Sequence, residues 1–136
     1  MAWIQSLMRL ADLEIETLQK RLAEISDRRV AMEMILASLD QELFQETARA
    51  RLDAEAAWYM VGFREGVKIR KAKALAQLNV CKLEEQGARE ALTVAFEGQK
   101  KYENIAETAR VAELKEEARR ENAALDEIAM RMTGTR

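Results

Sequence analysis

A seven-residue hydrophobic repeat runs through the first 57 residues of this chain. Reading from Ile4 in alternating steps of four and three selects sixteen positions, and thirteen of them are apolar, although only 49% of the chain is hydrophobic. A sustained spacing of 3.5 residues is typical of helices that supercoil around each other. The chain has no proline, and its first glycine is Gly62. The repeat therefore predicts one helix from near Ala2 to near Met60. The sixteen positions are Ile4, Met8, Ala11, Ile15, Leu18, Leu22, Ile25, Arg29, Met32, Leu36, Leu39, Leu43, Glu46, Ala50, Asp53 and Ala57.

The pair Gly62 and Gly66 near the middle of the chain predicts where this helix turns back. Glycine accepts the left-handed conformation that ends helices and shapes turns. We therefore expect an all-α fold, in which two long helices form an antiparallel coiled-coil hairpin. It would be a single coiled-coil domain over residues 1–136, with a first arm at 2–60, a turn at 61–67 and a second arm at 68–132. An unbroken helix is the alternative, because a glycine inside a helix costs only about 1 kcal/mol.

The second arm has a less regular pattern. One hydrophobic register contains Ile69, Ala76, Val80 and Leu83, with Leu92 and Phe96 near it, and a shifted register contains Leu114, Ala118, Leu125, Ile128 and Met132. A turn near Arg64 would pair residues whose numbers add up to about 128. Ile4 would then face Leu125, and Glu46 would face Lys82. Gly87 and Gly98 predict a stutter or local unwinding of this arm.

The composition argues against catalysis. The chain has no histidine, the commonest general base and metal ligand, and its single Cys81 cannot make a structural zinc site. We expect no cofactor, no metal and no small-molecule substrate, and we interpret Cys81 as a small buried hydrophobe. Acidic pairs such as Glu84–Glu85 and Glu116–Glu117 are interpreted as solvated helix faces.

Charge and aromatic residues gather around the expected turn. Residues 61–82 carry six cations, Arg64, Lys68, Arg70, Lys71, Lys73 and Lys82, against the single acid Glu65, although the whole chain has a net charge of -2. This stretch is either a solvated surface or a dock for an acidic protein surface, with anionic lipid and nucleic acid as weaker alternatives. A thin hairpin cannot readily bury Trp58, Tyr59 and Phe63 together, so we expect at least one exposed anchor; packing within the turn is the alternative.

Three polar residues interrupt the seam of the first arm: Arg29, Glu46 and Asp53. Such residues fix the register of a coiled coil at a cost in stability. A weakened segment that bends is the alternative interpretation.

Two segments of the second arm carry a resemblance to a known family. They are Phe96-Glu-Gly-Gln-Lys-Lys-Tyr-Glu-Asn-Ile-Ala-Glu107 and Arg119-Arg-Glu-Asn-Ala-Ala-Leu-Asp-Glu-Ile-Ala129. A lysine pair before an aromatic-Glu-x-Ile step, followed near the C-terminus by Leu-Asp-Glu-Ile-Ala, resembles the ending of the FliJ family. The first arm, including Arg9-Leu-Ala-Asp-Leu13 and Leu39-Asp-Gln-Glu-Leu43, is compatible with that family but generic. FliJ proteins are small coiled-coil components of the bacterial flagellar type III export apparatus.

The resemblance implies a non-enzymatic role in protein export. It implies a coiled coil similar to the central stalk of rotary ATPases, which binds the export ATPase hexamer, promotes assembly of its ring, and contacts the membrane export-gate protein and escort chaperones. It also implies a cytoplasmic location, peripheral to the inner membrane at the flagellar base. By analogy with rotary stalks, the end that carries both termini would enter the ring, through Trp3, Leu7, Leu10, Leu114, Ile128 and Met132. The turn end would serve the gate or chaperones, through Trp58, Tyr59, Phe63, Arg64, Lys68, Arg70 and Lys71.

Another functional class fits the residues alone. It is a coiled-coil scaffold or membrane-surface adaptor that acts by oligomerisation. Its membrane form has weak support, because residues 1–25 carry few cations and no apolar stretch approaches the ~20 residues that span a bilayer. We expect no nucleic-acid partner, since the net charge is negative and no recognition motif is present.

Overall fold

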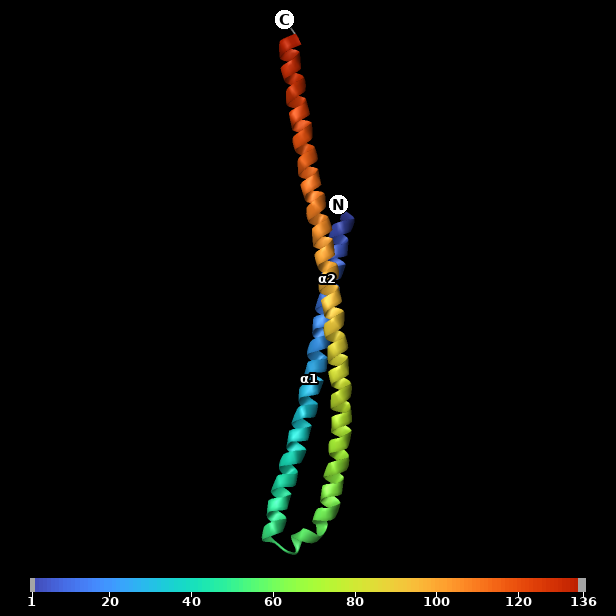
Figure 1. The fold of residues 1–136 in the computed structure, drawn as a ribbon, viewed down its shortest axis with the longest axis vertical. Coiled ribbons are helices and arrows are strands. Elements are labelled where there is room, and N and C mark those ends of the chain that lie inside the picture. Colours follow the sequence, from blue (N-terminus) through green and yellow to red (C-terminus); the bar gives the residue numbers. More distant parts are fainter. Residues whose placement is uncertain (1, 135–136) are drawn as a thin grey trace. The chain divides into compact units, whose positions relative to one another are not determined.

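The computed structural model of this chain describes residues 2–134, which form two long helices and one short one (Figure 1). Helix α1 spans Ala2–Leu52, the short 3-10 helix η1 spans Ala56–Tyr59, and α2 spans Met60–Gly134. The predicted all-α fold with two long helices is confirmed, and residues 2–134 contain no strand. Contacts between the helices divide the chain into two compact units. We call residues 16–93 the turn-side unit, and residues 2–15 with 94–134 the terminal unit.

In the turn-side unit, α1 and α2 lie side by side and run in opposite directions, joined by the short connection that contains η1 (Figure 1). Three ion pairs between the helices define the register: Arg28 with Glu84, Arg29 with Glu85, and Asp40 with Lys71. The residue numbers of these pairs add up to 112, 114 and 111. The predicted value of about 128 is therefore wrong by roughly two heptads.

The seam of α1 follows the predicted repeat closely. Each of the fourteen repeat positions from Ile4 to Ala50 is buried or half-buried, which confirms this part of the prediction. Ile25, only 1% exposed, is the most deeply buried of them. The last two positions, Asp53 and Ala57, are exposed because they lie beyond the end of α1.

The seam of α2 differs from the prediction. A row with strict seven-residue spacing is buried: Met60, Val67, Ala74, Cys81, Ala88 and Ala95. The predicted row is exposed instead, at Ile69, Ala76, Val80 and Leu83. The prediction followed the large hydrophobic side chains, whereas four of the six residues in the buried row of α2 are alanine or cysteine. The buried position of Cys81 confirms its interpretation as a small hydrophobe.

The turn also lies earlier than predicted. The chain leaves α1 after Leu52, and residues 61–67 are already inside α2, together with Gly62 and Gly66. The side-chain Oδ1 of Asp53 accepts a hydrogen bond from the backbone N–H of Glu55 at 3.0 Å, which supports the bend without glycine. A glycine inside a helix costs only about 1 kcal/mol, so the preference for a turn at the two glycines was weak. Pairing of the two helices along the seam therefore decided the position of the turn. Gly87 and Gly98 do not interrupt α2, so the predicted unwinding is wrong.

In the terminal unit, the start of α1 packs against α2 in the same antiparallel sense. The Gln99 side-chain amide donates a hydrogen bond to Asp12 at 2.6 Å, and Ile4 and Ala11 are buried. Leu125, which was expected to face Ile4, is 63% exposed. Helix α2 continues past the start of α1 as a single helix (Figure 1), and residues 117–134 are all exposed. Within residues 2–134, no helix is long and apolar enough to cross a bilayer.

Candidate functional site

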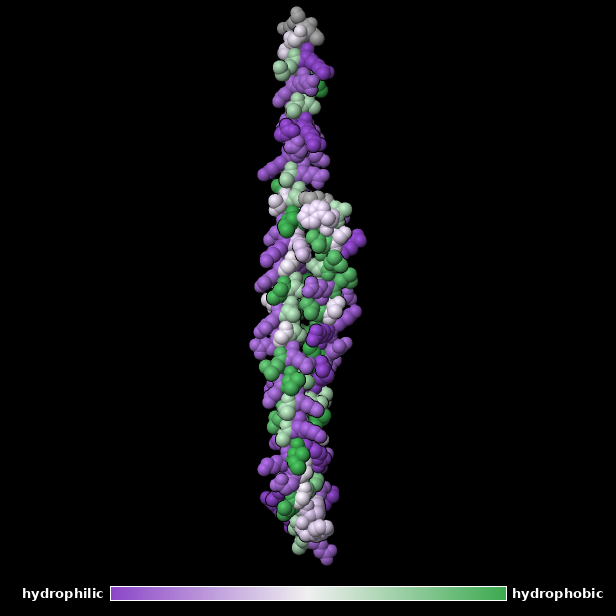
Figure 2. Space-filling model, turned by 90° about the vertical axis from the view of Figure 1, so that its right-hand side faces the viewer, coloured by the Kyte–Doolittle hydropathy of each residue, from purple (hydrophilic) through white to green (hydrophobic). Residues whose placement is uncertain are grey.

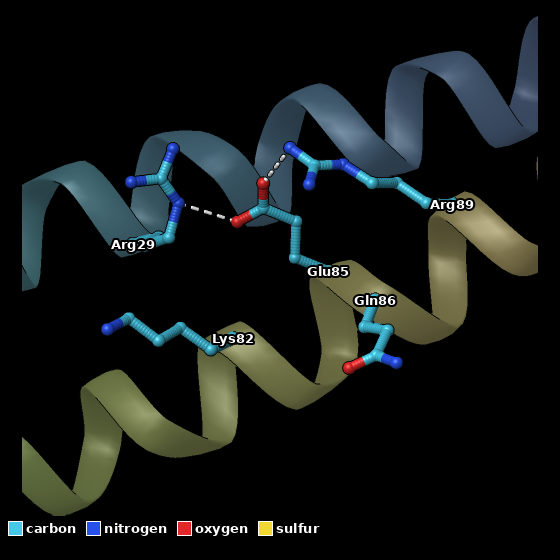
Figure 3. Close-up of a pocket in the computed structure, with 5 residues that line it drawn as sticks. All are labelled: Arg29, Lys82, Glu85, Gln86 and Arg89. Atoms are coloured by element: carbon cyan, nitrogen blue, oxygen red, sulfur yellow. Dashed lines mark hydrogen bonds and ion pairs between the residues drawn. The ribbon is translucent and has the colours of Figure 1, made fainter.

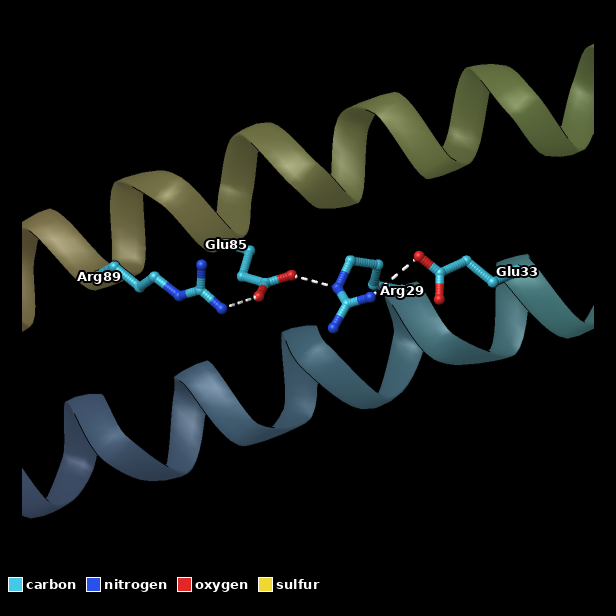
Figure 4. Close-up of polar contacts among 4 residues, drawn as sticks. All are labelled: Arg29, Glu33, Glu85 and Arg89. Carbon is cyan, nitrogen blue, oxygen red and sulfur yellow. Dashed lines mark hydrogen bonds and ion pairs between the residues drawn. The ribbon is translucent and has the colours of Figure 1, made fainter.

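A charged layer interrupts the apolar seam of the turn-side unit (Figure 4). Arg29 of α1 donates from Nε to Glu85 of α2 at 2.6 Å, and Arg89 donates to the other oxygen of the same carboxylate at 2.5 Å. Arg29 also donates to Glu33 at 2.9 Å. The Glu85 carboxylate, with its residue only 4% exposed, is thus buried between two guanidinium groups. Glu85 was expected on a solvated face, and that expectation is wrong.

The layer is charge-balanced, which decides what it can do chemically. The hydrogen bond that Arg29 donates to Glu85, followed by the one that it donates to Glu33, raises the pKa of Arg29, so this guanidinium is firmly charged. Each carboxylate in Figure 4 faces at least one guanidinium, and no buried side-chain polar atom among the described residues lacks a hydrogen-bond partner. Such a network fixes the register of two helices and offers no free nucleophile or base.

An open hollow of about 400 Å³ lies beside this layer (Figure 3). Arg29, Lys82, Glu85, Gln86 and Arg89 line it. The expected pair of Glu46 with Lys82 does not form, because the register of the ion pairs places Glu46 opposite residues near 67. Glu46 bonds to Tyr59 and Arg49 instead. Among residues 2–134 there is no cluster of acidic or cysteine side chains arranged to hold a metal ion.

The turn is closed by a polar and an aromatic contact. The Tyr59 hydroxyl donates to the Glu46 carboxylate at 2.5 Å, and this bond raises the pKa of Tyr59, with partial burial adding to the shift. The Tyr59 and Phe63 rings meet edge-to-face, with centroids 6.4 Å apart and an interplanar angle of 84°. These two rings therefore pack within the turn, as the alternative interpretation held. Trp58 is 83% exposed, as expected for at least one of the three.

The other residues predicted at the turn end lie on α2. Arg64, Lys68 and Arg70 are exposed. Lys71 is half-buried and forms an ion pair with Asp40 at 2.7 Å. The sequence did not identify the exposed Leu52 and Val61 that flank Trp58 in the chain.

The residues predicted for the opposite end belong to the terminal unit. Trp3 and Leu10 are exposed on α1, and Leu7 is half-buried between them along the chain. Leu114, Ile128 and Met132 are exposed on α2. Figure 2 shows hydrophobic patches between hydrophilic ones on one face of the molecule. Exposed apolar side chains on a helix that continues past its partner are a candidate contact surface for another protein.

Comparisons with known proteins agree with the resemblance found in the sequence. The model of the family described as "Flagellar FliJ protein" matches residues 1–136. The chain is 49% identical over 129 residues to the flagellar FliJ protein of Caulobacter vibrioides strain NA1000 / CB15N, covering 95% of this chain and 93% of that protein. The flagellar FliJ protein of C. vibrioides strain ATCC 19089 / CIP 103742 / CB 15 matches with the same identity and coverage. No solved structure matches the chain.

Proposed function

Because the chain belongs to the flagellar FliJ protein family, we propose that it is a non-enzymatic component of the flagellar type III protein export machinery. In this role it binds the export ATPase hexamer as a stalk-like coiled coil, promotes assembly and activity of the ring, and links the ring to the membrane export gate. The observation that carries the proposal is the family match over the whole chain. Its long paired helices are compatible with a stalk.

The terminal unit is the proposed contact for the ATPase. Trp3 and Leu10 expose apolar surface at the start of α1, and Leu114 does so where α2 leaves α1 behind. Farther along, the ion pairs Glu116–Arg119 and Glu127–Arg131 support α2 from within. A helix held in this way presents Ile128 to a partner without a second helix covering it.

The turn-side unit is the proposed contact for the export gate or for escort chaperones. Trp58 supplies an exposed aromatic side chain of the kind that anchors protein interfaces. Arg64 and Lys68 add positive charge close to it in the chain. With these contacts the protein would work in the cytoplasm, peripheral to the inner membrane at the flagellar base.

The test of the ATPase contact is hydrolysis by the purified export ATPase of the same bacterium, titrated with this protein while rings are counted by electron microscopy. We expect the rate to rise and to saturate near one copy per hexamer, with more closed rings. The variant Leu114→Glu/Ile128→Glu should lose the stimulation. The matched control Met34→Glu/Phe44→Glu changes exposed side chains of the turn-side unit and should keep it.

A flat titration with an active ATPase would refute the stalk role. Equal stimulation by both double variants would refute the placement of the contact in the terminal unit. The gate contact is tested separately, by measuring binding of the gate protein's cytoplasmic part to Trp58→Ala. We expect weaker binding with an unchanged helical circular dichroism spectrum, and unchanged affinity would reject Trp58 as the anchor.

A further inference from the structure

A partly apolar groove lies between α1 and α2 in the turn-side unit. Its volume is about 370 Å³, and its apolar lining includes the buried Leu39 and Ala74 and the part-exposed Ile35. Because Ala74 carries only a methyl group at a seam position, α2 leaves room there that a larger side chain would fill. The groove is thus a built-in depression of the helix pair, able to receive side chains from another molecule.

One rim of the groove is positively charged. Arg70 and Lys73 of α2 line it, against the single acid Glu42 of α1. Arg70 donates from Nε to the Gly66 carbonyl oxygen of its own helix at 3.4 Å. Within residues 2–134, neither Arg70 nor Lys73 forms an ion pair with a carboxylate, whereas Lys71 between them pairs with Asp40.

This lack of carboxylate partners sets the rim apart from most of the molecule's arginines. Eight other arginines among residues 2–134 form ion pairs, whereas Arg9, Arg21, Arg51 and Arg64 form none; the eight are Arg28, Arg29, Arg49, Arg89, Arg110, Arg119, Arg120 and Arg131. The two unpaired cations beside an apolar depression are therefore complementary to a ligand that brings both apolar and acidic groups.

We propose that this groove seats an acidic amphipathic helix of a partner protein. The groove lies between two antiparallel helices, so a third helix lying along it would present one apolar side chain per turn to Ile35, Leu39 and Ala74. Carboxylates on the flank of that helix would meet Arg70 and Lys73. A bilayer fits less well, because a concave site between helices keeps its buried floor away from a flat surface. This proposal about the chemistry of the partner goes beyond the proposed function. It rests on the proposed function only for the identity of the protein that carries the helix.

The probe is a fluorescein-labelled synthetic helix with leucine at heptad seam positions and glutamate on both flanks. A second peptide has lysine in place of every glutamate. Fluorescence anisotropy with the full chain measures both affinities. We expect the acidic peptide to bind at least about tenfold more tightly than the lysine peptide, with an affinity that falls as salt is added. Equal binding of the two peptides would overturn the proposal.

Variants locate the binding site. Arg70→Glu/Lys73→Glu reverses the rim, and Ile35→Glu places a charge in the apolar wall; each should weaken binding of the acidic peptide about tenfold or more. The control Lys100→Glu/Lys101→Glu makes the same change in net charge on exposed residues of α2 that do not line the groove. It should retain most of the affinity. Equal losses in the rim and control variants would show non-specific charge attraction and overturn the groove.

Three further readouts test whether folding, lipid binding or gate binding accounts for the peptide results. All substituted side chains are at least partly exposed, so circular dichroism should show unchanged helix content. Vesicles of phosphatidylcholine with phosphatidylglycerol should not displace the peptide; displacement from the wild-type chain would assign the surface to lipid and overturn the proposal. Competition by the gate's cytoplasmic part would identify the gate as the partner. Its failure to compete, with peptide binding intact, would refute the gate at this surface and leave the groove supported.

Discussion

The substitution Glu85→Leu separates the two effects of the buried charged layer, stability and register. The Glu85 side chain is almost fully enclosed, so a leucine there would bury most of its surface, which contributes about 1.5–3 kcal/mol. Loss of the pair with Arg89 costs at most about 0.5 kcal/mol, because Arg89 is largely exposed and four residues away on the same helix. Arg29 keeps Glu33 as a partner. Since burial of the carboxylate also has a dehydration cost, we expect the free energy of unfolding to stay within about 1 kcal/mol of wild type or to rise slightly.

Register is the property that we expect to change. The only cysteine, Cys81, lies buried in the seam of α2, and the pair Arg29–Glu85 places it opposite Met32. Met32→Cys should therefore form a disulfide with Cys81 under mild oxidation. Leu39→Cys, one heptad farther along α1, should not. With Glu85→Leu added, we expect the first disulfide to form less completely and the second to appear, because a seam of leucine, alanine and cysteine distinguishes poorly between heptads.

Guanidinium denaturation and mass spectrometry of the oxidised proteins are the measurements. A fall of more than about 2 kcal/mol in the free energy of unfolding would refute the burial argument. An unchanged disulfide pattern in the Glu85→Leu background would show that apolar packing alone sets the register. The variant Glu85→Gln keeps the shape of the side chain and controls for lost volume.

Three further predictions concern packing, the turn and the terminal unit. Ile25→Ala should lower the free energy of unfolding by about 2–5 kcal/mol, because Ile25 is fully buried, whereas the part-exposed Val30→Ala should cost less than about 1 kcal/mol; chemical denaturation checks both. In the Tyr102→Phe variant, ultraviolet titration should show the remaining phenol, Tyr59, ionising above the ordinary pKa of about 10, because its hydrogen bond to a carboxylate raises its folded pKa. The stability that this bond provides is present below pH 10 and is lost as the pH rises through the raised folded pKa. Ionisation of Tyr59 at or below pH 10 would disprove the turn contact. The hydrogen bond with Arg119 lowers the pKa of Glu116, so the stability from that contact is present above the ordinary carboxyl pKa of about 4.3 and is lost as the pH falls through the lowered value. NMR should show residues 112–134 of the wild type losing helix in that pH range. An equal loss in Glu116→Gln would contradict the ion-pair argument.

Part of the candidate surface could be predicted from the sequence, and part could not. Exposure of Trp58 followed from having more aromatic side chains at the turn than a thin helix pair can bury. The pairing of Arg29 with Glu85 could not be predicted, because the partner of a charged seam residue depends on the register of the two helices. The turn was predicted at the wrong position, so the predicted register was wrong as well. The groove at Ile35 and Ala74 was missed for a related reason, since an alanine in a helical sequence does not reveal whether it faces a partner or solvent.

The sequence by itself determined that the chain forms helices, that α1 presents one apolar stripe from Ile4 to Ala50, and that no histidine is present. These are local properties, because periodicity and residue type act within a few turns of helix. Only the tertiary structure decided the turn at residues 53–59, the seam of α2 through Ala74 and Ala88, and the burial of Glu85. Which stripe of α2 is buried depends on how closely the two backbones approach and on which charges meet across the seam. Small side chains allow the close approach, and the Arg29–Glu85 pair satisfies the one acid that it buries.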